Sequence, residues 1–184
     1  MAYTTIDDPS AYFQTTIYTG TGSSHAITNG GNSNLQPDFV WIKGRSGDGD
    51  DSTEHALTDS VRGVTKELST NDIGAVETVA QGLTAFGSNG FTVGTDASYN
   101  TSSATYVSWN WKAGGSSTST NSDGDINGTQ TVSQTAGFSV TTYSGNGGSN
   151  QRLGHGLGVT PKIYILKRRD NNGQWVFVNT LIDG

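Results

Sequence analysis

An internal repeat constrains the fold of this chain more than any other feature. The sequence contains PDFVWIKGR at 37–45 and PKIYILKRR at 161–169. In both copies a proline precedes a short run of bulky and β-branched residues that ends in basic residues. Such a run is too short and too continuously apolar for an amphipathic helix, and it is typical of a buried strand. We therefore expect one strand to occur twice.

The repeat extends beyond this strand. AYFQTTIYTGTG at 11–22 matches AGFSVTTYSGNG at 136–147, and HALTDSVRG at 55–63 corresponds to WVFVNTLIDG at 175–184. Each copy thus reads as a strand, a glycine-rich turn, a proline-led strand and a further strand. The pattern predicts two related β units.

The composition favours strands and turns and excludes several classes of partner. The 26 glycines and the frequent Ser, Thr and Asn supply tight turns, while Thr, Tyr, Trp and Val suit a pleated sheet. Without cysteine the chain has no disulfide and no thiolate metal site. A net charge of −6 argues against nucleic acid or an anionic membrane as a partner. No stretch approaches the roughly 20 apolar residues of a membrane span, so we expect no membrane insertion.

The clearest strand is expected at Thr105–Trp111, where the residue types alternate. One face carries Val107, Trp109 and Trp111, and the other carries Tyr106, Ser108 and Asn110. Large aromatic residues dominate β cores, so we expect the tryptophan face to be the inner face of a sandwich.

Three other segments have weaker signals. Ser88-Asn89-Gly90 contains the Asn-Gly pair that a type I′ hairpin prefers, and it predicts two short strands within 83–94. Residues 65–83 carry no clear period and are expected to form a loop. Met1 to Ser10 reads as an arm without regular structure, and we hypothesise that it anchors the chain to a larger particle.

These observations predict an all-β protein with two units. An antiparallel β-sandwich is expected at 1–115, a flexible Gly/Ser/Thr/Asn-rich linker at 116–131, and a second, incomplete copy at 132–184. The second copy lacks counterparts of GFTVG and YVSWNWKAG. We expect the missing strands to come from a continuation beyond Gly184, from neighbouring subunits, or from one sheet system shared by both halves.

Two sets of residues are candidate binding sites. Trp109 and Trp111, with Asn110, could contact a glycan, although the core interpretation of these rings is favoured. Asp123, Asp125 and Asn127 match the D-x-D-x-N-G start of a calcium loop, but Gln134 stands where the bidentate Glu is expected. A solvated turn is therefore favoured over calcium, and no other cofactor is indicated.

The remaining polar residues indicate no reaction. A second acidic cluster is formed by Asp48, Asp50, Asp51 and Glu54. The three histidines, His25, His55 and His155, lack the spacing of metal ligands. The run from Lys167 to Arg169 is expected to meet solvent or a partner carboxylate. Neither a nucleophile elbow nor a Walker loop is found, so we expect no enzyme.

Taken in order, these motifs resemble a family of repeat-containing phage proteins that are labelled tail-fibre or virion structural proteins. The similarity rests on PDFVWIKGR, HALTDSVRG, GFTVG and YVSWNWKAG, followed by AGFSVTTYSGNG, GHGLG and PKIYILKRR. It implies a concanavalin-like jelly-roll sandwich, a place on a virus particle and no catalytic activity. Such proteins often continue with further repeats.

The expectation is therefore a non-enzymatic virion structural protein, in a tail fibre or another exposed appendage. It would assemble with copies of itself, with a trimer as one candidate, and with other virion proteins, and it could contact host surface glycans. A capsid decoration protein, a soluble lectin-like module and a polysaccharide depolymerase remain as alternatives.

Overall fold

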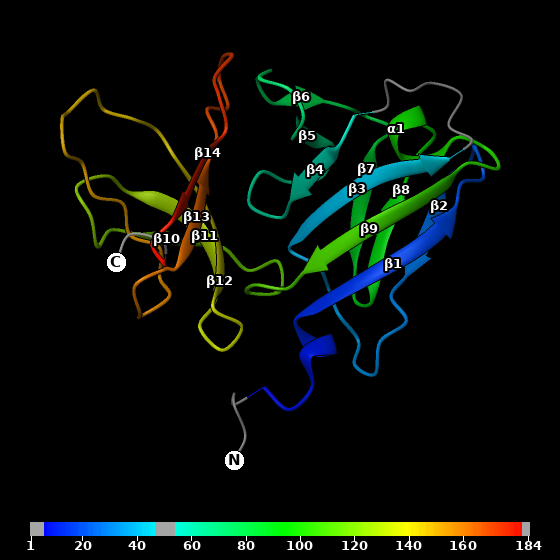
Figure 1. Cartoon of the computed structure of the whole chain (residues 1–184), viewed down its shortest axis with the longest axis horizontal. Helices are drawn as coiled ribbons and strands as arrows, with labels where there is room; N and C mark the ends of the chain where they lie inside the picture. The colour runs from blue at the N-terminus through cyan, green and yellow to red at the C-terminus, as the bar shows by residue number, and fades with distance from the viewer. Residues whose placement is uncertain (1–5, 47–53, 182–184) are drawn as a thin grey trace.

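The computed structural model describes residues 6–46 and 54–181, which form two all-β units (Figure 1). The chain begins with a 3₁₀ turn, η1 (Pro9–Ala11), in the arm that the sequence predicts to be irregular. Asp8 caps this turn by accepting hydrogen bonds from the backbone N–H and the hydroxyl of Ser10, and Ser33 donates to its second oxygen. The described part of the arm is thus tied to the first unit.

The first unit is an antiparallel sandwich, as predicted. One sheet has, in spatial order, β1 (Phe13–Thr19), β9 (Thr105–Trp111), β3 (Phe39–Ser46), β4 (Ala56–Asp59), β5 (Lys66–Ser69) and β6 (Glu77–Thr78). The other has β2 (His25–Thr28), β8 (Gly90–Val93) and β7 (Leu83–Gly87), and one helical turn, α1 (Ala97–Asn100), follows β8.

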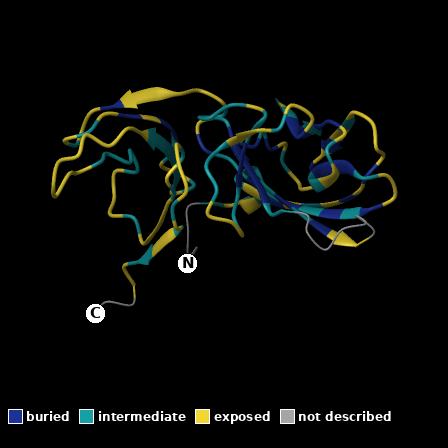
Figure 2. Cartoon of the chain, turned by 90° about the horizontal axis from the view of Figure 1, so that it is seen from above, coloured by how far each residue is buried: buried dark blue, intermediate teal, exposed yellow. Residues whose placement is uncertain are grey.

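The hydrophobic core lies between these two sheets. Its buried members are Tyr18, Ile27, Val40, Ile42, Ala56, Leu83, Phe91, Val93, Tyr99, Ala104 and Tyr106. Figure 2 shows that buried segments gather in this unit, whereas the second unit is largely exposed.

The second unit consists of two separate small sheets. One has β10 (Ser119–Asn121), β11 (Gly128–Ser133) and β12 (Phe138–Tyr143), and the other is a hairpin of β13 (Ile163–Leu166) and β14 (Val176–Asn179). The prediction of a flexible linker at 116–131 is wrong, because this segment contains β10 and the start of β11. None of the described strands of this unit joins the sheets of the first unit, so the two halves do not share one sheet system.

Strand β9 is turned the opposite way from the prediction. Tyr106, Ser108 and Asn110 are fully buried, whereas the face with Trp109 and Trp111 is the outer face of the sheet and is half-buried. The prediction that the tryptophan face forms the inner layer is therefore wrong.

Hydrogen bonding explains this reversal. The Asn110 side-chain amide donates to the Gln14 carbonyl at 3.2 Å, to Asn29 Oδ1 at 3.2 Å and to Ser108 Oγ at 3.0 Å. The Asn29 amide in turn donates to the Leu35 carbonyl. Part of the inner layer is thus a polar network, and buried polar groups are tolerated when they are hydrogen-bonded. A prediction based on hydrophobicity alone assigns the inner face incorrectly in such a case.

Two local predictions also need correction. The hairpin of β7 and β8 exists, but a type I′ turn requires positive φ at both central residues, and of Ser88, Asn89 and Gly90 only Gly90 has it (φ 132°). The stretch 65–83 is not entirely a loop, because β5 and β6 lie within it. Propensity is a weak guide for such short strands.

The carboxylate of Asp38 fixes the path by which the chain leaves the first unit. It is fully buried and accepts hydrogen bonds from the backbone N–H groups of Ala113 (2.7 Å), Gly115 (2.8 Å) and Ser116 (2.6 Å). The hydroxyl of Ser60 donates to it as well, at 2.8 Å. One side chain at the start of β3 therefore holds β4 and the segment that follows β9.

A second buried carboxyl group, Glu67 on β5, lies beside the core tyrosine Tyr99. The Tyr99 hydroxyl donates to Glu67 Oε2 at 2.7 Å, and Thr58 Oγ1 lies 3.4 Å from the same hydroxyl. Burial raises the pKa of Glu67 above its ordinary value of 4.5, and it also raises the pKa of Tyr99. Folding therefore makes the protonated form of Glu67 more favourable than it is in the unfolded chain.

This raised pKa makes stability depend on pH. Between about 4.5 and the raised value the folded state binds more protons than the unfolded state, so the free energy of unfolding falls as pH increases, and it levels off above that window. We expect Glu67→Gln to remove this fall, since the amide oxygen can still accept from Tyr99. Urea unfolding at a series of pH values checks this, with Asp123→Asn, an exposed carboxyl group in the second unit, as the control; an unchanged pH profile in Glu67→Gln would contradict it.

Candidate functional site

The hairpin β13–β14 reproduces the pairing of β3 and β4. In the first unit Phe39 pairs with Asp59 and Trp41 with Leu57. In the second unit the repeat-equivalent residues pair in the same way, as Ile163 with Asn179 and Ile165 with Phe177. The sequence repeat is thus a structural repeat with one register.

Two hydrogen bonds beyond the strands recur as well. The Ser60 N–H donates to the Asp38 carbonyl, and the equivalent Thr180 N–H donates to the Lys162 carbonyl, both at 2.8 Å. The turn after each second strand also begins alike, because the Val61 N–H donates to Asp59 Oδ1 and the Leu181 N–H donates to Asn179 Oδ1. The local structure of the two hairpins is therefore the same.

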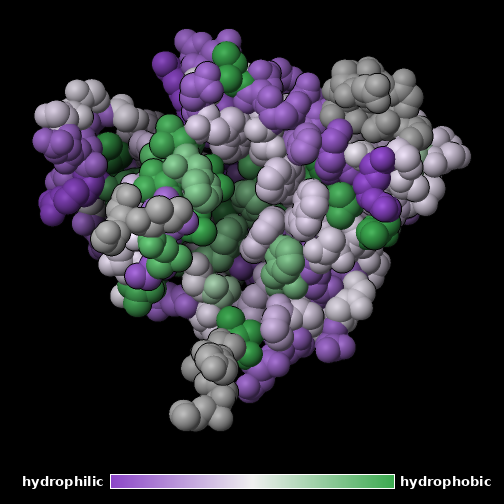
Figure 3. Space-filling view, in the orientation of Figure 1, coloured by the Kyte–Doolittle hydropathy of each residue, from purple (hydrophilic) through white to green (hydrophobic). Residues whose placement is uncertain are grey.

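The two hairpins differ in what covers them. On the inner face the equivalent pairs are Val40 and Tyr164, Ile42 and Leu166, and Ala56 and Val176. The first member of each pair is at most 1% exposed, whereas the second is 37–47% exposed. Phe177 on the other face is 61% exposed. Figure 3 shows this apolar surface as a patch of hydrophobic side chains over β13 and β14.

The exposure follows from missing neighbours. β3 lies between β4 and β9 and is covered by the second sheet of the sandwich, but β13 pairs only with β14 among the described strands. The Asp38 N–H donates to the Trp111 carbonyl of β9 at 2.8 Å. The equivalent N–H of Lys162 has no such acceptor in the described part of the chain. The β13 edge and both faces of the hairpin are therefore open.

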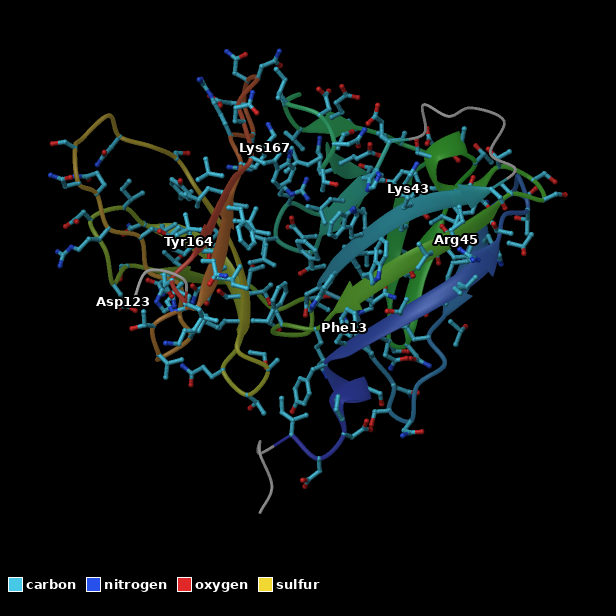
Figure 4. All side chains as sticks on the ribbon, in the orientation of Figure 1. Phe13, Lys43, Arg45, Asp123, Tyr164 and Lys167 are labelled. Carbon is cyan, nitrogen blue, oxygen red and sulfur yellow. The ribbon has the colours of Figure 1, made fainter. Side chains whose placement is uncertain are left out.

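The hairpin is nevertheless fixed at one end. Lys167 Nζ donates to the carbonyls of Ile73 (3.0 Å) and Gly74 (2.6 Å), and the Trp175 indole N–H donates to the Asp72 carbonyl at 2.9 Å. Figure 4 shows Lys167 at this junction and Tyr164 further along β13. The connection between β5 and β6 thus holds the hairpin in place while its apolar faces remain accessible.

The glycan-contact candidates on β9 do not form an open platform. Asn110 is fully buried, so its side chain cannot reach a ligand. The Trp111 ring is covered by Phe138 of β12, with a centroid distance of 6.1 Å. Trp109 packs against Trp41 at 5.4 Å with an interplanar angle of 54°. Tilted, half-buried rings offer little flat surface for stacking a sugar.

The calcium-loop candidates are not arranged as ligands. Asp125 binds Arg152, whose Nε and guanidinium NH2 lie 3.0 and 3.1 Å from its two carboxylate oxygens. This arginine lowers the pKa of Asp125 to about 2. Asp123 is exposed, and Asn127 lines the same cleft as Asp125. Within the described ranges no group of three or more His, Asp and Glu residues could hold a metal ion.

The other polar candidates are dispersed. His25 lies near Tyr18, His55 near Trp41, and His155 accepts a hydrogen bond from the Leu157 N–H. The acidic cluster near residue 50 falls outside the described residues except for Glu54.

Nothing in the described part of the chain forms a helix long and apolar enough to cross a membrane. The missing counterparts of GFTVG and YVSWNWKAG predicted that the second copy lacks covering strands, but the run IYIL at 163–166 itself reads like any buried strand, so its exposed residues could not be named in advance.

Comparison with protein families gives one match. Residues 8–183, nearly the whole chain, fit a model described as a domain of unknown function, DUF7483. Neither the curated proteins nor the solved structures contain a match. The match therefore includes both β units and assigns no activity.

Proposed function

We propose, from the premise that the chain belongs to the DUF7483 family, that it is a non-enzymatic structural subunit of a phage particle, in a tail fibre or another exposed appendage. In this proposal the hairpin β13–β14 is its assembly surface. The subunit joins copies of itself or other particle proteins there.

The exposure of the hairpin is the observation that carries this proposal. A two-stranded hairpin is at best marginally stable in water, and its open apolar edge can pair with a strand of another chain. Burying one large aliphatic or aromatic side chain stabilises by about 1.5–3 kcal/mol. Seven apolar residues of the hairpin and its connections are at least 41% exposed: Val159, Ile163, Tyr164, Ile165, Val176, Phe177 and Leu181. A partner that covered these side chains would therefore bind with a substantial hydrophobic contribution to the free energy of association.

The first unit indicates what that partner supplies. There, β9 pairs along β3 and a second sheet covers the inner face. The neighbouring subunit would likewise add a strand along β13 and an apolar layer over Tyr164 and Leu166. Lys162 occupies the position that Asp38 has in the first unit. Asp38 binds backbone N–H groups, whereas the positively charged Lys162 would be matched by a carboxylate of the neighbouring subunit.

The assignment to a phage particle rests on the motif resemblance and is supported by the character of the surface. The loops are rich in Gly, Ser, Thr and Asn, and the described residues offer no cluster suited to catalysis by a metal. A capsid decoration protein would use the same assembly surface, and it differs only in its place on the particle.

Substitution in the hairpin tests the assembly surface. We expect the wild-type chain to associate in sedimentation velocity as concentration increases, and Phe177→Lys to raise the dissociation constant at least about tenfold, because it places an unpaired charge in an apolar contact. Ile17→Lys is the matched control, since Ile17 is 63% exposed on β1, away from the hairpin.

Either of two results would contradict this surface. One is a wild-type chain that stays monomeric at every concentration. The other is dissociation by Ile17→Lys without any effect of Phe177→Lys, which would place the contact on the outer face of the large sheet.

Location on the particle is tested separately by immunogold electron microscopy of intact source particles, with antibody against this chain. We expect gold on the tail or its fibres. Gold confined to the head would identify a decoration protein, and the absence of labelling on the particles would leave a free lectin or an enzyme as the better account.

A further inference from the structure

The second unit contains a polar cleft that the assembly surface does not use. It has a volume of about 540 Å³ and lies between the sheet β10–β11–β12 and the segment after β13. Its polar lining includes Asp125, Asn127, Tyr143, Ser144, Asn146 and Arg169. Small-molecule sites commonly measure about 300–1,000 Å³, so the cleft is large enough for one or more sugar rings.

Arg169 gives the cleft an unpaired positive charge. Asp125 in the cleft lining binds Arg152, and Asp170, the next residue along the chain from Arg169, binds Arg168 at 2.7 Å. Among the residues that the structure describes, no carboxylate lies within ion-pair distance of the Arg169 guanidinium. A free guanidinium is suited to bind a carboxylate through two parallel hydrogen bonds.

The backbone around Arg169 is held in place. Its carbonyl accepts a hydrogen bond from the Val76 N–H of the first unit at 2.9 Å. The guanidinium therefore extends from a fixed point on the chain, and binding a ligand would not require this segment to be ordered first.

The remaining lining suits a sugar. The side chain of Tyr143 is 39% exposed and offers an aromatic face, on which the C–H face of a pyranose can pack. The side chains of Asn127 and Ser144 make no hydrogen bond within the described part of the chain, so their donors and acceptors are available for hydroxyl groups. Ile126 is the one aliphatic side chain in the lining.

We propose that this cleft binds an acidic sugar residue of a glycan, with the sugar carboxylate on Arg169, the ring against Tyr143, and hydroxyl groups on Asn127 and Ser144. The ionised Asp125 in the wall disfavours a polyanion with several adjacent phosphates but tolerates a single carboxylate. Binding here does not require the β13–β14 assembly surface.

The test uses two acidic probes, trigalacturonic acid and sialyllactose, each beside its methyl ester as the neutral control. Titration of the full chain is followed by NMR chemical shifts and by calorimetry. We expect at least one acid to bind and its ester to bind at least about tenfold more weakly, because the ester loses the charge-assisted hydrogen bonds. Arg169→Gln should weaken binding of the acid by a similar factor, whereas Arg45→Gln, an exposed arginine on β3 outside the cleft, should leave it unchanged.

Three results would overturn the proposal: no binding of either acid at millimolar concentration, equal binding of acid and ester, or unaltered binding by Arg169→Gln. Repeating the titration with Phe177→Lys separates this site from the assembly surface. Retained binding in that variant supports a cleft that works independently of the β13–β14 assembly surface, and lost binding contradicts that independence.

Discussion

A strand hairpin with apolar residues on both faces needs a third strand and a covering layer, and the architecture of this chain depends on whether it receives them. The chain builds the same hairpin twice, with one register. The first copy lies within a six-stranded sheet under a second sheet, and its inner side chains are buried. The second copy has neither neighbour among the described strands. The first unit is therefore a complete sandwich, and the second has an apolar surface open to a partner.

One substitution within the repeat explains part of this difference. Asp38 uses its buried carboxylate to gather the backbone N–H groups that follow β9, which holds β9 in register beside β3. Lys162 occupies the equivalent position in the second copy and can only donate. The two hairpins thus share their pairing but would recruit different neighbours, the first a segment of its own chain and the second a strand with an acidic group at this corner.

The sequence predicted the parts of this structure that depend on local pattern. The repeat, the all-β class and the equivalence of 55–63 with 175–184 could be read from residue types and spacing. The inner face of β9 could not, because it depends on hydrogen bonds from Asn110 to Asn29 and Gln14, which are distant in sequence. The ion pair of Asp125 could not be predicted for a similar reason, since its partner Arg152 comes from another loop. The missing strands of the second copy could be inferred from the incomplete repeat, but which apolar residues they leave exposed could not, because the run IYIL looks the same whether or not the chain covers it.

Hydrogen–deuterium exchange within one sample compares the two hairpins and shows whether only the second one lacks a cover. Residues 39–42 and 56–59 provide an internal reference for 163–166 and 176–179, because the pairing is the same. We expect the first hairpin to stay protected at all protein concentrations, whereas the second exchanges quickly in the monomer and becomes protected as the chain associates. Equal protection of both hairpins in the monomer would contradict it.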